Sequence, residues 1–254
     1  MNKSIKTLGI TATLLSCCLS AQALAEVGGE FDLSFAIKTN HLWHGFIVTD
    51  GVMTAGALEY KTADKNTTFG LWAGGSFNGE YKEFTYYASH KFSDNFFIEI
   101  VNHGNHSGIA DDEVDIFNYS SDDSKTGNVS DIGMGYTFSG DTPISLYYAI
   151  IIQGVDKHID DSSGELERSY TNYIEVSAPV WHGKNGETVN AFVGGAFSPV
   201  HKRNFYSDNA NINNVGFTFS KEINLLNTSF PVSATAMWNP ALNHGALQVA
   251  VELF

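Results

Sequence analysis

The sequence has few basic side chains and no long hydrophobic run. Its 254 residues carry 14 lysines and arginines against 28 aspartates and glutamates, a formal charge of −14. An acidic chain without a basic cluster repels phosphate backbones, which argues against nucleic-acid binding. No apolar run reaches the roughly 18 residues of a helical membrane span. The 5 prolines fall at the ends of the apolar segments or between them, where a missing amide hydrogen breaks no strand pairing.

Cysteine is confined to the first 25 residues. This stretch has Lys3 and Lys6, then an apolar region, then Ala23 and Ala25 in an A-x-A cleavage pattern, as in a secretory signal peptide. We expect residues 1–25 to be removed, together with Cys17 and Cys18, and residues 26–254 to form one domain without disulfides. A lipoprotein cleavage site ending at Cys17 is a less favoured alternative.

Apolar residues recur at every second position after residue 30, which is the period of a β-strand with two different faces. The pattern begins at Phe31, Leu33, Phe35 and Ile37. This is the first of twelve such segments, and the last ends near Leu253. A helical period of useful length is absent, so the sequence predicts an all-β fold.

Connection lengths distinguish between kinds of sheet. Short turns follow the even-numbered segments, whereas long acidic connections follow several odd-numbered ones, at 104–129, 154–167 and 199–210. A two-sheet sandwich, the alternative, has no reason for this segregation. The pattern predicts a single antiparallel transmembrane β-barrel of about 12 strands, with short periplasmic turns and long outer loops in the bacterial outer membrane. Two aromatic girdles are expected, an outer one at Trp43, Phe46, Phe77, Phe197 and Trp238 and a periplasmic one at Tyr60, Phe92, Phe96, Phe138 and Trp181.

If the apolar positions face lipid, the intervening positions line the lumen. Carboxylates dominate this set, and rings of carboxylates favour cations in a pore. The candidates for selectivity are Glu83, Glu99, Glu175, Asp32 and Glu59. The same phase places Gln153 in the lumen, together with aromatic candidates for contact with neutral solutes, Trp72, Tyr87, Tyr147 and Tyr173. The alternative is that these side chains only fill a narrow interior.

The histidines and the acidic loops give weaker indications of a metal or catalytic site. His41, His44, His103 and His106 are candidate metal ligands, but a three-residue spacing on an extended chain puts each pair on opposite faces. Exposed loop histidines are the favoured interpretation, so no metal and no cofactor is expected. Hydrolase motifs such as G-x-S-x-G and H-E-x-x-H are absent, which favours a protein that is not an enzyme.

Two features resemble known outer-membrane proteins. The final Phe254, after an alternating strand, resembles the signal read by the barrel assembly machinery, although Glu252 stands where an aromatic residue is usual. The segment from His41 to Gly51, followed by Phe69, Gly70, Leu71 and Trp72, resembles the start of the TorF-type porin family, with His44 where that family has arginine. The resemblance implies an outer-membrane channel and supplies no catalytic residue.

These observations predict an outer-membrane porin-like channel for passive diffusion of small polar solutes, with a preference for cations. Its expected partners are outer-membrane lipid, lipopolysaccharide, the assembly machinery and the solutes. Two alternatives stay open. One is a non-conducting structural or receptor barrel with plugging loops, and the less favoured one is a barrel-borne hydrolase.

Overall fold

The computed structural model describes residues 28–119, 126–160 and 163–254, so the expected signal peptide lies outside the described chain. Within these ranges the regular structure consists of β-strands. No helix there is long and apolar enough to cross a membrane.

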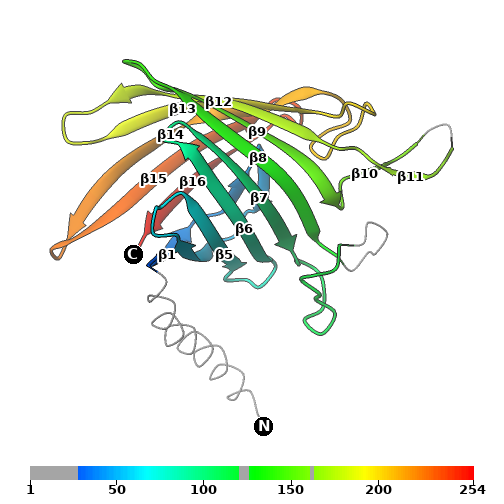
Figure 1. Cartoon of the computed structure of the whole chain (residues 1–254), viewed down its shortest axis with the longest axis horizontal. Helices are drawn as coiled ribbons and strands as arrows, with labels where there is room; N and C mark the ends of the chain where they lie inside the picture. The colour runs from blue at the N-terminus through cyan, green and yellow to red at the C-terminus, as the bar shows by residue number, and fades with distance from the viewer. Residues whose placement is uncertain (1–27, 120–125, 161–162) are drawn as a thin grey trace, which may run out of the picture.

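Twelve of the described strands close into an antiparallel barrel in the order β1-β16-β15-β14-β13-β12-β9-β8-β7-β6-β5-β4 (Figure 1). The predicted all-β barrel and its strand number are confirmed. Its strands are β1 (Glu30–Lys38), β4 (Met53–Lys61), β5 (Thr67–Ser76), β6 (Lys82–Ser93), β7 (Phe96–Asn105), β8 (Asn128–Phe138), β9 (Ile144–Gly154), β12 (Asn172–His182), β13 (Thr188–Phe197), β14 (Asn211–Leu225), β15 (Thr228–Asn239) and β16 (His244–Glu252). Two small hairpins lie outside this ladder: β2 (His41–Trp43) with β3 (Phe46–Thr49), and β10 (Lys157–Ile159) with β11 (Leu166–Arg168).

The two ends of the barrel differ as the connection lengths predict. At one end, here called the turn end, strands join through residues 62–66, 94–95, 139–143, 183–187 and 226–227. At the other, the loop end, the long connections are 39–52, 106–127, 155–171 and 198–210. The start of β1 and the C-terminus lie together at the turn end, while the β10–β11 hairpin projects from the loop end (Figure 1).

The exterior of the barrel is an apolar belt. Leu33, Phe69, Ile100 and Leu247 each keep half or more of their surface exposed, because the strand alternation turns them away from the lumen. A continuous apolar surface of this kind is unfavourable in water and matches the lipid-facing band of a membrane barrel.

Aromatic side chains mark both ends of this belt, with two exceptions. Phe77 and Trp238 are exposed near the loop end, and Phe92, Phe138 and Trp181 near the turn end. The expectation for Trp43 and Phe46 is wrong. These residues belong to the β2–β3 hairpin, where they pack against Tyr206 rather than facing lipid.

The barrel closes through a short seam. β1 pairs with β16 through Ala36–Glu252, Ile37–Val251 and Lys38–Ala250, whereas β1 pairs with β4 along its whole length. Two backbone hydrogen bonds between Phe35 and the last two residues extend the seam, and the Phe254 ring stacks on Phe35 at 5.8 Å.

Candidate functional site

The lumen is the candidate site, and its loop-end half is occupied by the chain itself. The β2–β3 hairpin connects β1 to β4 but contacts β14 and β15, neither of which is a neighbour of β1 or β4 in the barrel. Asn213 on β14 donates to the His44 carbonyl at 2.8 Å, and Asn239 on β15 donates to the Gly45 carbonyl at 3.0 Å. Both asparagines have no exposed surface. The hairpin is therefore held inside the barrel by buried hydrogen bonds.

Gly45 makes this approach possible. It adopts φ +88°, and a Cβ atom at this position would lie 1.9 Å from the Asn213 carbonyl oxygen. Only glycine combines the left-handed backbone with such a close approach. The sequence His44-Gly45 is thus the tip that seats the hairpin against β14.

The His44 side chain contacts two tyrosines, Tyr173 and Tyr206. Its ring stacks on Tyr173 with centroids 3.8 Å apart, and its Nδ1 lies 2.8 Å from the Tyr206 hydroxyl. Burial, with a smaller contribution from the charge on His103, lowers the pKa of His44 from 6.5 to about 3. The imidazole is therefore neutral at neutral pH.

His41 lies at the other end of β2 and is also neutral. Its ring stacks on Trp72 at 5.6 Å and approaches Tyr81. Burial, with smaller contributions from the charges of Lys38 and His103, lowers the pKa of His41 from 6.5 to about 3. The hairpin therefore carries two imidazoles that stay uncharged while it is seated.

The 198–210 loop covers the hairpin. Tyr206, which is 4% exposed, packs against Trp43 and Tyr173. The loop is tied down because the Phe205 amide donates to the Thr171 hydroxyl, which in turn donates to Asp156 at 2.7 Å. Burial raises the pKa of Asp156 despite these hydrogen bonds.

Acidic side chains line the wall around this hairpin. Glu83 accepts hydrogen bonds from Tyr81 at 2.8 Å and Thr85 at 3.0 Å. Beside it, His103 places Nε2 3.1 Å from Asp131 and Nδ1 3.9 Å from Glu83. This group of two carboxylates and one imidazole lies near the loop end, and within it His103 and Asp131 are hydrogen-bonded to each other.

The other selectivity candidates also face inward, with partners of their own. Glu99 accepts from the Tyr147 hydroxyl at 3.1 Å, and Glu175 accepts from Tyr173 and from Asn214. Nearer the turn end, Lys61 bonds Asp32 at 2.8 Å and Glu59 at 3.3 Å, and Tyr87 donates to Glu59. Glu59 and Asp32 therefore share the ammonium group of Lys61 within the barrel wall.

The four aromatic candidates are likewise engaged by the chain. Trp72 stacks with His41, Tyr173 stacks with His44, and Tyr87 and Tyr147 hold carboxylates. The candidate metal ligands His41, His44, His103 and His106 do not gather into a group of three donors in the described chain.

Two cavities remain on either side of the hairpin. One of about 340 Å³ lies toward the loop end, between the hairpin and the wall of β6–β8, where Glu83, His103 and Asn105 line it. The other, of about 380 Å³, lies deeper against β12–β16. Its wall is polar and includes Glu175, Asn190, Asn214, Thr218, Thr235 and Gln248. Trp43 borders both cavities, so the hairpin forms the partition between them.

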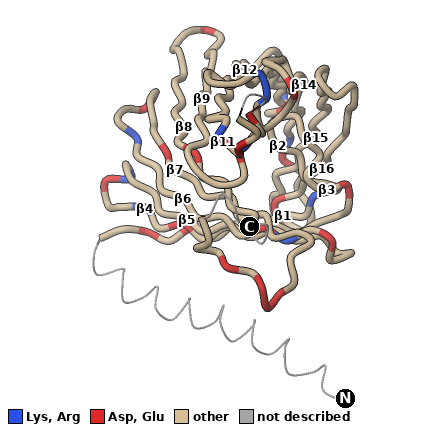
Figure 2. Tube along the Cα trace, turned by 90° about the vertical axis from the view of Figure 1, so that its right-hand side faces the viewer, with Lys and Arg blue, Asp and Glu red and all other residues tan. Residues whose placement is uncertain are grey.

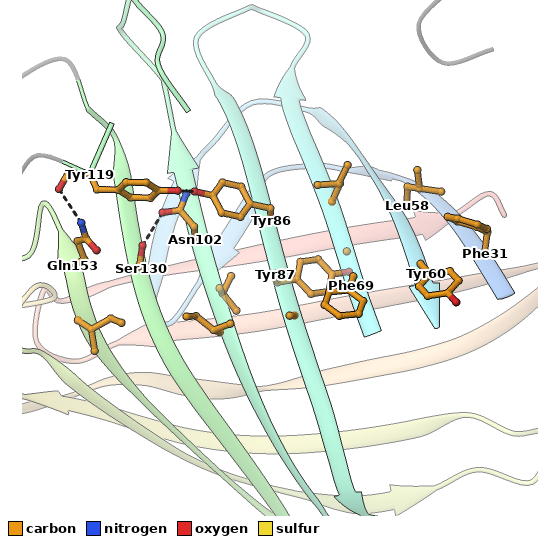
Figure 3. A pocket seen from close by; sticks show the side chains of 16 residues that line it. Phe31, Leu58, Tyr60, Phe69, Tyr86, Tyr87, Asn102, Tyr119, Ser130 and Gln153 are labelled. Atoms are coloured by element: carbon orange, nitrogen blue, oxygen red, sulfur yellow. Dashed lines mark hydrogen bonds between the residues drawn. The ribbon is translucent and has the colours of Figure 1, made fainter. Parts of the chain in front are cut away.

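A third hollow of about 630 Å³ lies on the outer face of the barrel (Figure 3). Its floor is apolar, with Phe31, Leu58 and Phe69. Its loop-end edge is polar, where Tyr119 meets the Tyr86 hydroxyl and Ser130 donates to Asn102.

Gln153 lines this outer hollow, so its expected place in the lumen is wrong. A register shift between Ser130 and Asp131 pairs them with Gln153 and Ile151, which leaves Ile152 as an extra residue. A β-bulge of this kind reverses the phase of the residues beyond it. Gln153 consequently shares the face of Ser130 and donates to the Tyr119 carbonyl.

Sequence reasoning missed the role of the β2–β3 hairpin. The signal was present as His41-Leu42-Trp43-His44-Gly45-Phe46-Ile47-Val48, a stretch too apolar for an exposed loop. Alternation reveals two faces but does not show which one meets another part of the chain, so it predicts an outer-girdle position for Trp43 and Phe46.

Comparisons with known proteins yield no family model and no curated protein that matches the chain. Among solved structures it is similar to the beta domain of the Bordetella autotransporter BrkA, with 9% identity, a TM-score of 0.37 and coverage of 89% of this chain and 98% of that one. It is also similar to Wzi, an outer-membrane protein described as a carbohydrate-binding β-barrel involved in group 1 capsule assembly in Escherichia coli. That match has 8% identity and a TM-score of 0.33, and covers 87% of this chain and 56% of Wzi. The closed antiparallel ladder and the apolar exterior are those of a transmembrane β-barrel.

Proposed function

We propose that the protein is a gated outer-membrane channel for small polar solutes, with a preference for cations, and that the β2–β3 hairpin is its gate. The observation that carries the proposal is the position of the hairpin between two cavities of the lumen, of which the deeper one has a polar wall, with Trp43 bordering both. A barrel that serves only as a scaffold has no need of a polar chamber behind its plug.

The cation preference follows from the carboxylates that reach these cavities. Glu83 lines the cavity toward the loop end, and Glu175 lines the deeper cavity. Carboxylates near a low-dielectric wall attract cations and repel anions. Glu59 reaches neither cavity and is paired with Lys61, so it contributes little to the field along the path.

Conductance in planar bilayers tests both statements. The wild-type protein is compared with a variant in which residues 41–49 are replaced by a Gly-Ser segment of equal length, after gel mobility has shown that both are folded. We expect rare, small openings in the wild type and a steady, larger conductance in the variant. A folded variant that carries no current contradicts a channel function.

Selectivity is measured in the same bilayers from the reversal potential under a salt gradient. Glu175→Gln is expected to reduce the preference for cations, because it removes a charge from the deeper cavity. The matched control Glu59→Gln removes an equal charge that Lys61 already balances, and is expected to change the potential much less. Equal shifts in the two variants would refute the assigned path.

A non-conducting barrel is the second candidate, because the hairpin is gripped by Asn213 and Asn239, neither of which has exposed surface. It predicts silence in the wild type, because a hairpin held in this way never opens, whereas a gated channel shows rare openings. The recordings of the wild type therefore separate the two functions.

A further inference from the structure

The β10–β11 hairpin collects metal-ligating side chains on one face. His158 lies opposite Glu167 in the register of the pair, and the Asp160 amide donates to the Glu165 carbonyl one step farther along. Residues opposite each other, and residues two apart on one strand, share a face. The sequences Lys157-His158-Ile159-Asp160 and Glu165-Leu166-Glu167-Arg168 thus place an imidazole and three carboxylates together.

Three of these side chains already meet. A donor atom from each of His158, Asp160 and Glu167 lies within 4.8 Å of the other two. Asp160 is partly exposed and Glu167 is exposed, whereas His158 keeps only 5% of its surface exposed. The group therefore combines a fixed imidazole with carboxylates that can close on an ion.

Two contacts hold the imidazole ring of His158 in place. His158 places Nδ1 3.1 Å from the Ser169 hydroxyl, and Ser169 is 1% exposed. The ring also stacks on His201 from the 198–210 loop, with centroids 3.7 Å apart. A ring held through one nitrogen presents the other to a metal, which is the arrangement that orients histidine ligands in metalloproteins.

The basic residues of this hairpin face away from the group. Lys157 and Arg168 are paired with each other in the register and lie on the opposite face with Ile159 and Leu166. Arg168 donates to the Ile152 carbonyl at 3.0 Å. The strand geometry thus keeps the Arg168 charge off the face that carries Glu167.

We propose that His158, Asp160 and Glu167 bind a divalent transition-metal ion, with Zn²⁺ as its representative, at the loop end of the barrel. One imidazole and two carboxylates suit Zn²⁺ and its neighbours, whereas Mg²⁺ and Ca²⁺ prefer oxygen ligands alone. Three protein ligands leave a coordination position for water or for a group from outside. The site stands apart from the lumen and does not depend on channel activity.

Calorimetric titration tests the site on refolded, full-length mature protein without a histidine tag, in detergent micelles. Zn²⁺ is titrated at pH 7.5 into the wild type, His158→Gln, Glu167→Gln and Ser169→Ala. His182→Gln is the matched control, because His182 is exposed at the turn end of β12. Mg²⁺ and Ca²⁺ are titrated separately.

We expect one Zn²⁺ ion per chain. His158→Gln and Glu167→Gln should abolish binding or weaken it at least about tenfold, and His182→Gln should leave it unchanged. Ser169→Ala should weaken it by roughly 10- to 100-fold, the usual effect of losing the group that orients a ligand. Bound Co²⁺ should give an absorption band that His158→Gln removes.

Three results would overturn the proposal. The first is no saturable Zn²⁺ binding by folded wild type, and the second is equal affinity in the wild type and His158→Gln. The third is binding of Mg²⁺ or Ca²⁺ as tight as that of Zn²⁺, which would describe an acidic loop without a ligating imidazole. Because Glu167 is exposed, Glu167→Gln tests the site even if His158→Gln fails to fold.

Discussion

At the scale of single residues, Gly45 decides whether the hairpin can sit in the lumen. Its φ of +88° and the 1.9 Å approach to the Asn213 carbonyl both exclude a side chain. Gly45→Ala is expected to destabilise the seated hairpin by about 1–3 kcal/mol from the backbone conformation alone. The displaced hairpin should raise channel conductance and expose the 39–52 connection to protease.

Gly79→Ala is the matched control for this prediction. Gly79 has a similar φ of +77°, but a Cβ atom there would meet nothing within 4 Å. It should therefore show backbone strain without displacement of the hairpin. If both variants open the channel equally, the close contact at Asn213 is not what holds the hairpin.

Residue alternation predicts the lumen face well and its contacts poorly. Glu83, Glu99 and Glu175 point inward as expected, because each lies on a regular ladder. Gln153 does not, because a bulge reverses its face. His103 contacts Asp131 on the neighbouring strand across a long connection, and His44 contacts Tyr173 from a distant part of the sequence. Local periodicity carries no information about such pairs.

At the scale of elements, the β2–β3 hairpin should respond to acid. The pKa of His44 and that of His41 are each about 3 when the hairpin is seated, against 6.5 when it is free. The two histidines therefore favour the seated hairpin over the free one fully above pH 6.5. This stabilisation is lost as the pH falls from 6.5 toward 3, because in this range the histidines of the free hairpin bind protons and those of the seated hairpin do not. We expect conductance to rise as pH is lowered from 7 to 4.5.

The double variant His41→Gln/His44→Gln provides the control for this pH dependence. His103, Glu83 and Asp131 lie in the adjacent wall and remain in both proteins, so any contribution from the wall is common to the two measurements. The variant should lose most of the rise in conductance between pH 7 and pH 4.5. An unchanged pH profile would assign the effect to the wall.

At the scale of the whole molecule, the β1–β16 seam is the weakest ladder of the barrel. It has three paired residues on each strand, whereas β15 and β16 pair through eight. A disulfide across the seam, made with Ala36→Cys and Glu252→Cys, is expected to raise the temperature at which the barrel unfolds in detergent. Heat-modified gel mobility under oxidising and reducing conditions measures the change.

Ser233→Cys with Ala250→Cys is the control pair, because it joins β16 to β15 on the same inward face. This ladder is already long, so its disulfide should raise the unfolding temperature less. Equal stabilisation by the two pairs would show that unfolding does not begin at the seam.

The architecture of the whole molecule was the part most open to prediction. Two-residue alternation and the segregation of connection lengths depend only on local sequence, and both follow from the need to pair every strand and to face lipid. The obstruction of the lumen could not be predicted in this way. It depends on whether a loop is long enough and apolar enough to turn inward, and on partners that lie far along the chain.

The contacts of the hairpin also set an order of assembly. Asn213 and Asn239 lie 169 and 194 residues after the atoms they hold, so the hairpin gains its hydrogen bonds only when the last strands arrive. Contacts of such high sequence separation form late and slowly. Closure of the barrel and seating of the hairpin therefore belong to one late, cooperative step. A chain whose folding stops before β14 has neither a closed barrel nor a seated hairpin.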